Sequence, residues 1–325
     1  MGSVVVPLVQ HHGQANDDKT CETLHGVPSS RDSVRVLHYT NHTLRDDVAL
    51  TILGAYCPNV RVLHAELHSL ASAKLECLPT HAFAHLTHLT LVEHPTGIHS
   101  TRTPSQILAF LRLLPRLTHL SLTFDGLCDT EASPVTSPVP ALPFSLVRYD
   151  VKGAFPGWTA PIHCSLDSLH ELIVRFNPMG EREDHRREIL HAAACVAPRL
   201  RLLHIRNCPT DPLELIPVLS RCGRLHHLSL ELSTHRGTQL DALLAALPVP
   251  LRELGVFIWV HQGEFLDAAC CQYIVTHLEQ NVSSRRLRRL NFDAGPGERV
   301  GVDALQPIQM FCRTHHVACD EFHSE

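Results

Sequence analysis

Pro198-Arg199-Leu200-Arg201-Leu202-Leu203-His204-Ile205-Arg206-Asn207-Cys208-Pro209 is the stretch that decides the fold of this chain. It places apolar residues at the first, fourth and sixth places of a short phrase, and Cys208 three places further on. The same phrase returns along the whole chain. Its other copies have these apolar residues: Val34-Leu37-Tyr39, Val60-Leu63-Ala65, Leu86-Leu89-Leu91, Leu117-Leu120-Leu122, Leu146-Tyr149-Val151, Leu169-Leu172-Val174, Leu225-Leu228-Leu230, Leu251-Leu254-Val256 and Leu287-Leu290-Phe292.

The spacing of these copies is typical of a leucine-rich repeat. Subtraction of successive starting positions, from 34 to 287, gives intervals of 23 to 36 residues. Leucine-rich repeats are roughly 20–29 residues long, so most intervals fit and a few contain insertions. A degraded last copy is expected between Val317 and Phe322. The sequence therefore predicts about ten irregular repeats.

Three apolar residues at the first, fourth and sixth places cannot all face one side of an isolated strand. They fit a short strand whose bends turn them toward a core that forms only when repeats stack. Helical patterns separate the phrases, some opening at Thr103-Pro104 and Asp211-Pro212, others at about 46–56, 182–197, 239–247, 265–280 and 302–316. We expect an α/β solenoid, a leucine-rich-repeat horseshoe with a curved parallel β-sheet on the concave face and helices on the convex face. A generic leucine-rich helical protein is the alternative, but it does not explain the constant spacing within each phrase.

The repeats define the domain organisation. Residues 1–33 are polar and aperiodic, which predicts an irregular N-terminal tail or cap. Residues 34–325 form the repeat domain, with loop insertions at about 124–145 and 152–165. Loops of this length are either connectors or binding elements, and we favour connectors.

Composition excludes several classes of function. A net charge of −5 and a pI near 6.6 lack the basic character of nucleic-acid-binding proteins. No apolar run reaches the length of about 18 residues that suggests a membrane span, and the first ten residues lack the basic start of a secretory signal. The 12 cysteines fall short of disulfide-scaffold density. We therefore expect a reducing compartment, cytoplasmic or nuclear, with no nucleic-acid or membrane partner.

Motifs for catalysis and cofactors are missing. The sequence contains no Gly-x-Ser-x-Gly, phosphate-binding or dinucleotide-binding motif and no recognisable Cys/His nucleophile pattern. Cys270-Cys271 has no second cysteine pair to complete a zinc site. We expect no enzyme activity, no cofactor and no metal ion.

Candidate binding residues come from the second, third and fifth places of the phrase, which should face away from the core and line the concave surface. Arginine is favoured among them because it is enriched at interface hot spots. Neighbouring strands lie about 4.8 Å apart, so His38 should lie beside His64, and His88 beside His119. The predicted partner contacts are Arg35, His38, Arg61, His64, His88, His119, Arg148, Asp150, Glu171, Arg201, His204, His227, Glu253, Arg288 and Arg289.

The 26 histidines raise an alternative function, a metal-binding or pH-sensing protein. A metal site needs three or four converging ligands. The phrase supplies histidine pairs and no triad, and histidines also occur in the tail, helices and loops. Compositional bias explains that distribution better.

Leu200 to Cys208 (Leu-x-x-Leu-x-Ile-x-x-Cys) and Leu169 to Asn177 (Leu-x-x-Leu-x-Val-x-x-Asn) resemble ribonuclease-inhibitor-type and cysteine-containing leucine-rich repeats. Cys-Pro-Asn-Val-Arg-Val-Leu and Leu-Pro-Arg-Leu-Thr-His-Leu-Ser-Leu resemble the repeat regions of F-box proteins of mushroom-forming fungi. The resemblance covers residues 34–322.

This resemblance implies a role in ubiquitin ligation. In that family an N-terminal F-box binds Skp1 of a cullin ubiquitin ligase, and the repeats hold the substrate. Residues 1–33 contain no Leu-Pro-x-Glu start and no two-helix apolar pattern. The sequence therefore predicts a non-enzymatic protein-interaction scaffold whose partner, under the resemblance, is a degradation substrate. Skp1 is expected as a partner only with a divergent F-box.

Overall fold

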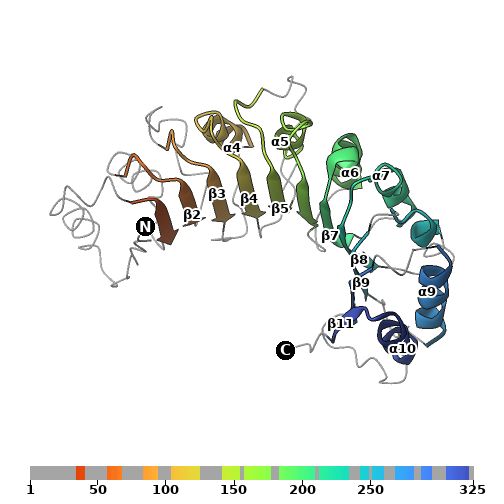
Figure 1. Cartoon of the computed structure of the whole chain (residues 1–325). Helices are drawn as coiled ribbons and strands as arrows, with labels where there is room; N and C mark the ends of the chain where they lie inside the picture. Colours follow the sequence, from red (N-terminus) through yellow and green to blue (C-terminus); the bar gives the residue numbers. More distant parts are fainter. Residues whose placement is uncertain are drawn as a thin grey trace. The chain divides into compact units, whose positions relative to one another are not determined.

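A computed structural model describes residues 34–40, 57–67, 83–93, 104–124, 141–153, 157–176, 183–208, 212–233, 242–248, 251–259, 268–281, 287–294 and 305–321. The chain divides into two compact units, Met1–Ser168 and Leu169–Glu325. Each unit is built from the same strand phrase. Figure 1 shows the elements of both.

The first unit contains a parallel sheet in which strands follow one another in sequence order. Equal places of the phrase are aligned on neighbouring strands, so the third places Val36, Val62 and His88 are register partners. The strands are β1 (Val36–Thr40), β2 (Val62–Leu67), β3 (His88–Glu93), β4 (His119–Phe124) and β5 (Arg148–Lys152).

The helices of the first unit are α4 (Pro104–Leu111) and α5 (Ala160–His163), which lie on the same side of the strands (Figure 1). Helix α4 begins at Pro104, as the sequence predicted, because proline has the helical φ and no N–H to leave unpaired there. The core lies between the strands and this helical layer. It holds fully buried side chains such as Leu120 and Leu122 of β4 and Leu111 of α4.

Residues 157–165 belong to the second predicted insertion, and they pack into the core of their repeat. The indole of Trp158 is fully buried. The hydroxyl of Tyr149 donates a hydrogen bond to the Trp158 carbonyl oxygen (3.0 Å), and the Leu146 N–H donates to Oγ of Ser165 (2.8 Å). This segment thus supplies the helical side of the repeat whose strand is β5.

The second unit repeats the arrangement with a second parallel series of strands in sequence order. The strands are β6 (Glu171–Arg175), β7 (Leu202–Cys208), β8 (His227–Ser233), β9 (Glu253–Trp259), β10 (Arg289–Ala294) and β11 (Ala318–Glu321). The described helices include α6 (Glu183–Val196), η2 (Ala197–Arg199), η3 (Pro212–Leu215), α7 (Ile216–Leu219), α9 (Ala268–Asn281) and α10 (Gln306–His315), and residues 242–245 are helical as well. Helices α6, α7, α9 and α10 lie on one side of these strands (Figure 1).

The last strand confirms the degraded copy near the C-terminus but changes its register. Ala318 pairs with Arg289, a third-place residue, and Cys319 pairs with the fourth-place Leu290. The copy therefore starts at position 316 rather than at Val317. Val317 is only 5% exposed, so this apolar second-place residue was mistaken for the first place of the repeat.

A regular backbone ladder joins the repeats at the start of each strand. From β1 to β5 in the first unit, and from β6 to β10 in the second, the carbonyl oxygen of each second-place residue accepts hydrogen bonds from the N–H groups of the second and third places of the next repeat. For example, the Arg201 carbonyl accepts from His226 (2.9 Å) and His227 (3.0 Å). This bonding fixes the register, so each place of the phrase forms a continuous row across the strands.

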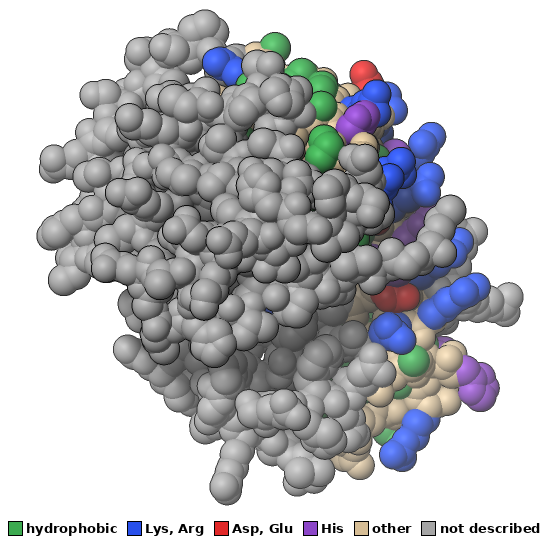
Figure 2. All heavy atoms as spheres, turned by 90° about the vertical axis from the view of Figure 1, so that its left-hand side faces the viewer, with side chains coloured by type: hydrophobic (Ala, Val, Ile, Leu, Met, Phe, Trp, Pro, Cys, Tyr) green, Lys and Arg blue, Asp and Glu red, His purple; other side chains and the backbone are tan. Residues whose placement is uncertain are grey.

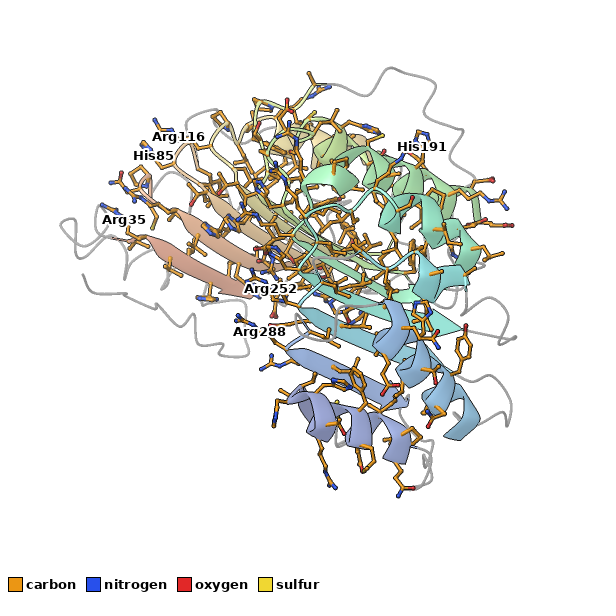
Figure 3. The ribbon with its side chains drawn as sticks, turned by 45° about the vertical axis from the view of Figure 1, so that its right-hand side comes forward. Arg35, His85, Arg116, His191, Arg252 and Arg288 are labelled. Carbon is orange, nitrogen blue, oxygen red and sulfur yellow. The ribbon has the colours of Figure 1, made fainter. Side chains whose placement is uncertain are left out.

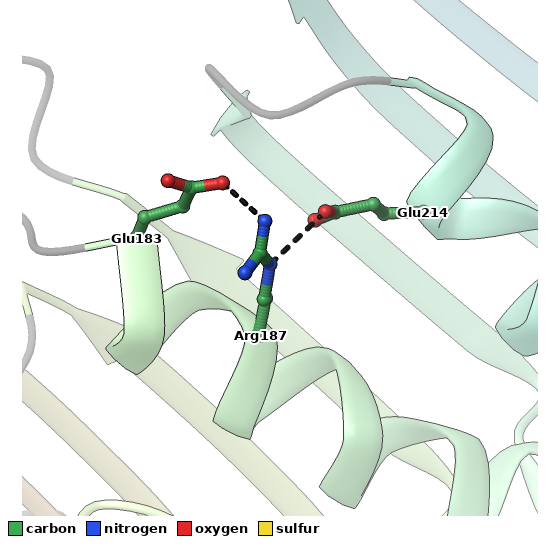
Figure 4. A network of polar contacts seen from close by, with 3 residues as sticks. All are labelled: Glu183, Arg187 and Glu214. Atoms are coloured by element: carbon green, nitrogen blue, oxygen red, sulfur yellow. Dashed lines mark hydrogen bonds and ion pairs between the residues drawn. The ribbon is translucent and has the colours of Figure 1, made fainter.

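Adjacent helical segments of the second unit are also linked by charge. Arg187 on α6 bonds to Glu183 one turn earlier, and its Nε donates to Oε1 of Glu214 on η3 at 3.2 Å (Figure 4). Both carboxylates raise the pKa of Arg187, the Glu214 hydrogen bond most of all. The guanidinium therefore joins two consecutive repeats on the helical side, exposed to solvent.

The predicted fold class is confirmed: this is an α/β solenoid of leucine-rich-repeat type. The predicted helices at about 182–197, 265–280 and 302–316 correspond to α6, α9 and α10. The tail at 1–33, the predicted helix at 46–56 and residues 125–140 of the first predicted insertion lie outside the described residues. No helix within the described ranges is long and apolar enough to cross a membrane.

Candidate functional site

The side of the strands opposite the helices carries the second, third and fifth places of the phrase, and we name it the open face. In the phrase at Leu200, the first, fourth and sixth residues are at most 1% exposed, whereas Arg201 is exposed and His204 is half-buried. All predicted contact residues occupy open-face places: Arg35, His38, Arg61, His64, His88, His119, Arg148 and Asp150 in the first unit, and Glu171, Arg201, His204, His227, Glu253, Arg288 and Arg289 in the second.

His38 and His64 lie side by side in the fifth-place row, as the spacing predicted. They are register partners on β1 and β2, and their ring centroids are 5.6 Å apart at an interplanar angle of 44°. Nε2 of His64 also lies 3.4 Å from Oε1 of Glu66 on the same strand.

His88 and His119 form a closer pair in the third-place row. Their rings stack with centroids 4.0 Å apart and an interplanar angle of 13°. Each Nδ1 lies 2.9 Å from the hydroxyl of the preceding threonine, Thr87 or Thr118, and each hydroxyl donates to the carbonyl oxygen of the preceding repeat at 3.1 Å. Since those hydroxyl protons are engaged, each hydroxyl accepts from Nδ1–H. Burial lowers the pKa of His88, which favours this neutral stack.

Asp150 is the predicted contact that offers least surface. It is a fifth-place residue on β5 and pairs in register with Ser121, but only 7% of it is exposed. Its carboxylate lies close enough to raise the pKa of the neighbouring Tyr149 hydroxyl further, in addition to the larger effect of burial.

His204 on β7 is held by an arginine on its own strand. The Nε of Arg206 donates a hydrogen bond to Nε2 of His204 at 2.7 Å. Burial, followed by the charges of Arg206 and Arg175, lowers the pKa of His204 to about 4. His204 is therefore neutral at pH 7 and accepts a hydrogen bond through Nε2.

The third-place row of the second unit contains a charged group of three residues. His227, Glu253 and Arg289 are register partners on β8, β9 and β10. Oε2 of Glu253 lies 3.0 Å from Nδ1 of His227 and 3.9 Å from an Nη atom of Arg289. The three side chains are 37–47% exposed. They present a carboxylate between an imidazole and a guanidinium to solvent and remain accessible to a partner.

The histidines of the open face meet in pairs. Among the described residues, no group of three His, Cys, Asp or Glu side chains could hold a metal ion. The described histidine pairs offer hydrogen-bond donors and acceptors to a partner.

The predicted contact set left out His170, His226 and Arg252, which are second-place residues. These residues complete a row in the second unit that also contains Arg201 and Arg288. Figure 3 shows Arg252 and Arg288 next to each other at the starts of β9 and β10. The sequence alone could have identified this row, because the second place is basic in five consecutive phrases from Leu169 to Leu287.

Basic side chains also occur at the strand starts of the first unit. Arg35 lies at the start of β1, and Arg116, just before β4, has an Nη atom 3.0 Å from Nδ1 of His85 (Figure 3). In the space-filling view, Lys and Arg side chains with some His follow one border of the described surface (Figure 2). Arg35 and Arg116 thus place basic groups near the starts of two strands of this unit.

Comparison with known proteins supports the fold. No protein-family model matches the sequence, and no curated protein matches it. The leucine-rich repeat-containing protein LegL7 from Legionella pneumophila has a similar solved structure, with a TM-score of 0.50, 15% identity, and coverage of 89% of this chain and 82% of LegL7. The fold is that of a leucine-rich-repeat protein.

A second solved structure, the complex of Rad7 and Elc1 in yeast, is less similar. Its TM-score is 0.40 and its identity is 13%, over 89% of this chain and 84% of the matched chain. At these values the likeness says nothing about function, and the argument about function depends on the open face itself.

Proposed function

We propose that this protein is a non-enzymatic interaction scaffold whose open face binds a partner protein. The observation that carries the proposal is the row His227–Glu253–Arg289, in which three charged or titratable side chains are aligned by strand register and remain 37–47% exposed. Partly exposed ion pairs contribute little to stability. The carboxylate of Glu253 beside the guanidinium of Arg289 can instead select a complementary protein surface.

Rigidity of the face supports this role. Each row is fixed by parallel pairing and by a buried core whose first-, fourth- and sixth-place side chains are almost fully inaccessible, such as Leu228 and Leu254. A preorganised face loses little conformational entropy on binding. Contacts made by rigid strands are also more specific than contacts made by long mobile loops.

The finer proposal is that the partner is a degradation substrate and that the chain acts as the substrate-recognition part of an F-box-type ubiquitin ligase in the cytoplasm or nucleus. This step rests on the resemblance of the repeats to those of fungal F-box proteins. It predicts that Skp1 and a cullin bind the same chain through a divergent F-box.

The test is an affinity purification of the tagged full chain from a fungal lysate, read by mass spectrometry, with two charge-reversal variants. Glu253→Lys lies on the open face and Glu279→Lys makes the same change on helix α9, where Glu279 is half exposed. We expect the retained proteins to be lost with Glu253→Lys and kept with Glu279→Lys. Equal retention by both variants would refute the open face as the binding site, and absence of Skp1 would refute the ligase role alone.

A further inference from the structure

The second-place row of the second unit is a continuous basic edge, and we name His170, Arg201, His226, Arg252 and Arg288 the basic rim. Each member is bonded to the next through the backbone: the N–H groups of Arg201, His226, Arg252 and Arg288 donate to the carbonyl oxygens of the preceding members at 2.7–2.9 Å. Five basic side chains therefore start five neighbouring strands, about 4.8 Å apart.

The rim is open to solvent. Arg201, Arg252 and Arg288 are exposed, and His170 and His226 are half-buried. Within the described part of the chain, those three arginines form no ion pair with a carboxylate. Arg199 and Arg224 directly precede the first places of two of these phrases and are also exposed, so they add positive charge along the same edge.

The positive charge of the rim affects the pKa of one of its own members, His226. Burial lowers the pKa of His226, and the charges of Arg252, His227 and Arg201 lower it further. Concentrated positive charge of this kind attracts anionic ligands and speeds their association. Two carboxylates, those of Glu171 and Glu253, lie beside the rim in the third-place row, and other acidic side chains of the unit lie on helices, for example Glu183 on α6 and Glu279 on α9.

We propose that the basic rim binds an extended, acidic segment of a partner protein, laid across the starts of strands β6 to β10. This inference rests on the proposed function and specifies the chemistry of the partner. Five strands about 4.8 Å apart span about 19 Å. An extended chain covers about 3.3 Å per residue, so about six residues with alternating carboxylates match the rim.

A peptide fits the surroundings better than a nucleic acid. The neighbouring third-place row carries the carboxylates of Glu171 and Glu253, which a continuous phosphate backbone would meet at close range. A peptide can place neutral or basic residues opposite them. Single-stranded nucleic acids also need aromatic platforms for stacking, and the rim consists of arginine and histidine alone. The chain's pI near 6.6 is far below that of typical nucleic-acid-binding domains.

The proposal is tested by fluorescence anisotropy of the full chain at low ionic strength. The probe is a fluorescein-labelled peptide that alternates glutamate with serine, and its control has glutamine in place of glutamate. We expect the glutamate peptide to bind and the glutamine peptide to bind at least about tenfold more weakly, because charge complementarity supplies the affinity.

Variants locate the binding site. Arg252→Glu with Arg288→Glu should weaken binding of the glutamate peptide by more than about tenfold, and Arg252→Gln with Arg288→Gln should weaken it less. Arg313→Glu on α10 reverses an exposed charge away from the rim and should leave binding unchanged. Equal losses with Arg313→Glu would overturn the proposal, because net charge alone would then explain binding.

Two other outcomes would also overturn it: equal binding of the glutamine peptide, or displacement of the glutamate peptide by a much tighter-binding oligothymidylate. The affinity purification separates this inference from the proposed function. Partners that depend on Glu253 but not on Arg252 and Arg288 would leave the scaffold role standing without the rim. If the rim binds the peptide but the lysate yields no partner that depends on Glu253, the rim inference stands and the proposed scaffold function is refuted.

Discussion

The Nε of Arg206 donates a hydrogen bond to Nε2 of His204 across 2.7 Å. Burial of this ring, followed by the charges of Arg206 and Arg175, makes the stability of the protein depend on pH. The pKa of His204 is lowered from 6.5 to about 4. The unfolded chain therefore takes up a proton near pH 6.5, whereas the folded chain does so only near pH 4. Stability contributed by the neutral ring is present above pH 6.5 and is lost as the pH falls to 4, by on the order of 2 kcal/mol.

The measurement is urea unfolding of wild type and His204→Gln between pH 7.5 and about pH 4. The variant should lose less stability than wild type over this window, because glutamine can accept the Arg206 hydrogen bond without titrating. Burial also lowers the pKa values of His88 and His226, so a smaller slope should remain in the variant. Identical slopes for the two proteins would contradict the assignment to His204.

Gly153, at the end of β5, provides a test of the strand packing in the first unit. Its φ is +78°, and a Cβ atom added there would lie 2.5 Å from the carbonyl oxygen of Phe124. Gly153→Ala should therefore cost about 2 kcal/mol or more, since both the backbone conformation and the backbone contact oppose it. Thermal unfolding followed by circular dichroism measures the change.

Gly223 supplies the matched control for that substitution. A Cβ added at Gly223 meets nothing within 4 Å, and its φ is not in the left-handed region. Gly223→Ala should change stability by no more than about 0.5 kcal/mol. If both alanine variants unfold at the wild-type temperature, the close approach of Gly153 to Phe124 does not exist in solution.

The cysteines should differ widely in reactivity. Burial raises the pKa of Cys222 to about 12, and burial together with the neighbouring Cys319 raises the pKa of Cys312 to about 12. Cys195 on α6 is exposed. Because only the thiolate reacts, iodoacetamide at pH 8 should modify Cys195 at least about a hundredfold faster than Cys222 or Cys312.

Peptide mass spectrometry over time gives these rates, and the same labelling in urea shows that each thiol reacts once it is exposed. Fast labelling of Cys222 in the folded protein would show that its helix end opens readily. Its thiol donates to the Val218 carbonyl oxygen at 3.2 Å, which should oppose such opening.

The sequence predicted the strands and their rows because each repeat contacts only its neighbours. A constant phrase then determines the register, and the pairings of His38 with His64 and His88 with His119 followed from spacing alone. The bond between Arg206 and His204 could not be predicted in this way, because it depends on side-chain rotamers. The error at Val317 has a related cause. Val317 is buried although it occupies a second place, so the sequence alone suggested that the repeat begins there rather than one residue earlier.

Tyr149, a fourth-place residue of the strand phrase, holds the segment that completes its repeat. Its side chain is fully buried, its hydroxyl donates to the Trp158 carbonyl oxygen at 3.0 Å, and burial raises its pKa. Tyr149→Phe keeps the ring but leaves that carbonyl oxygen without this donor. We expect a loss of about 1–2 kcal/mol, the usual cost of an unmade buried hydrogen bond.

The loss should be accompanied by local opening of residues 157–165, because the removed bond ties that segment to β5. Hydrogen exchange can test this, with faster exchange expected at the N–H of Cys164, which bonds to the Ala160 carbonyl oxygen at 3.0 Å in α5. Exchange in the second unit, for example at Ser220 in the turn after α7, should stay at the wild-type rate. Uniform acceleration in both units would mean that the bond stabilises the whole fold rather than this segment.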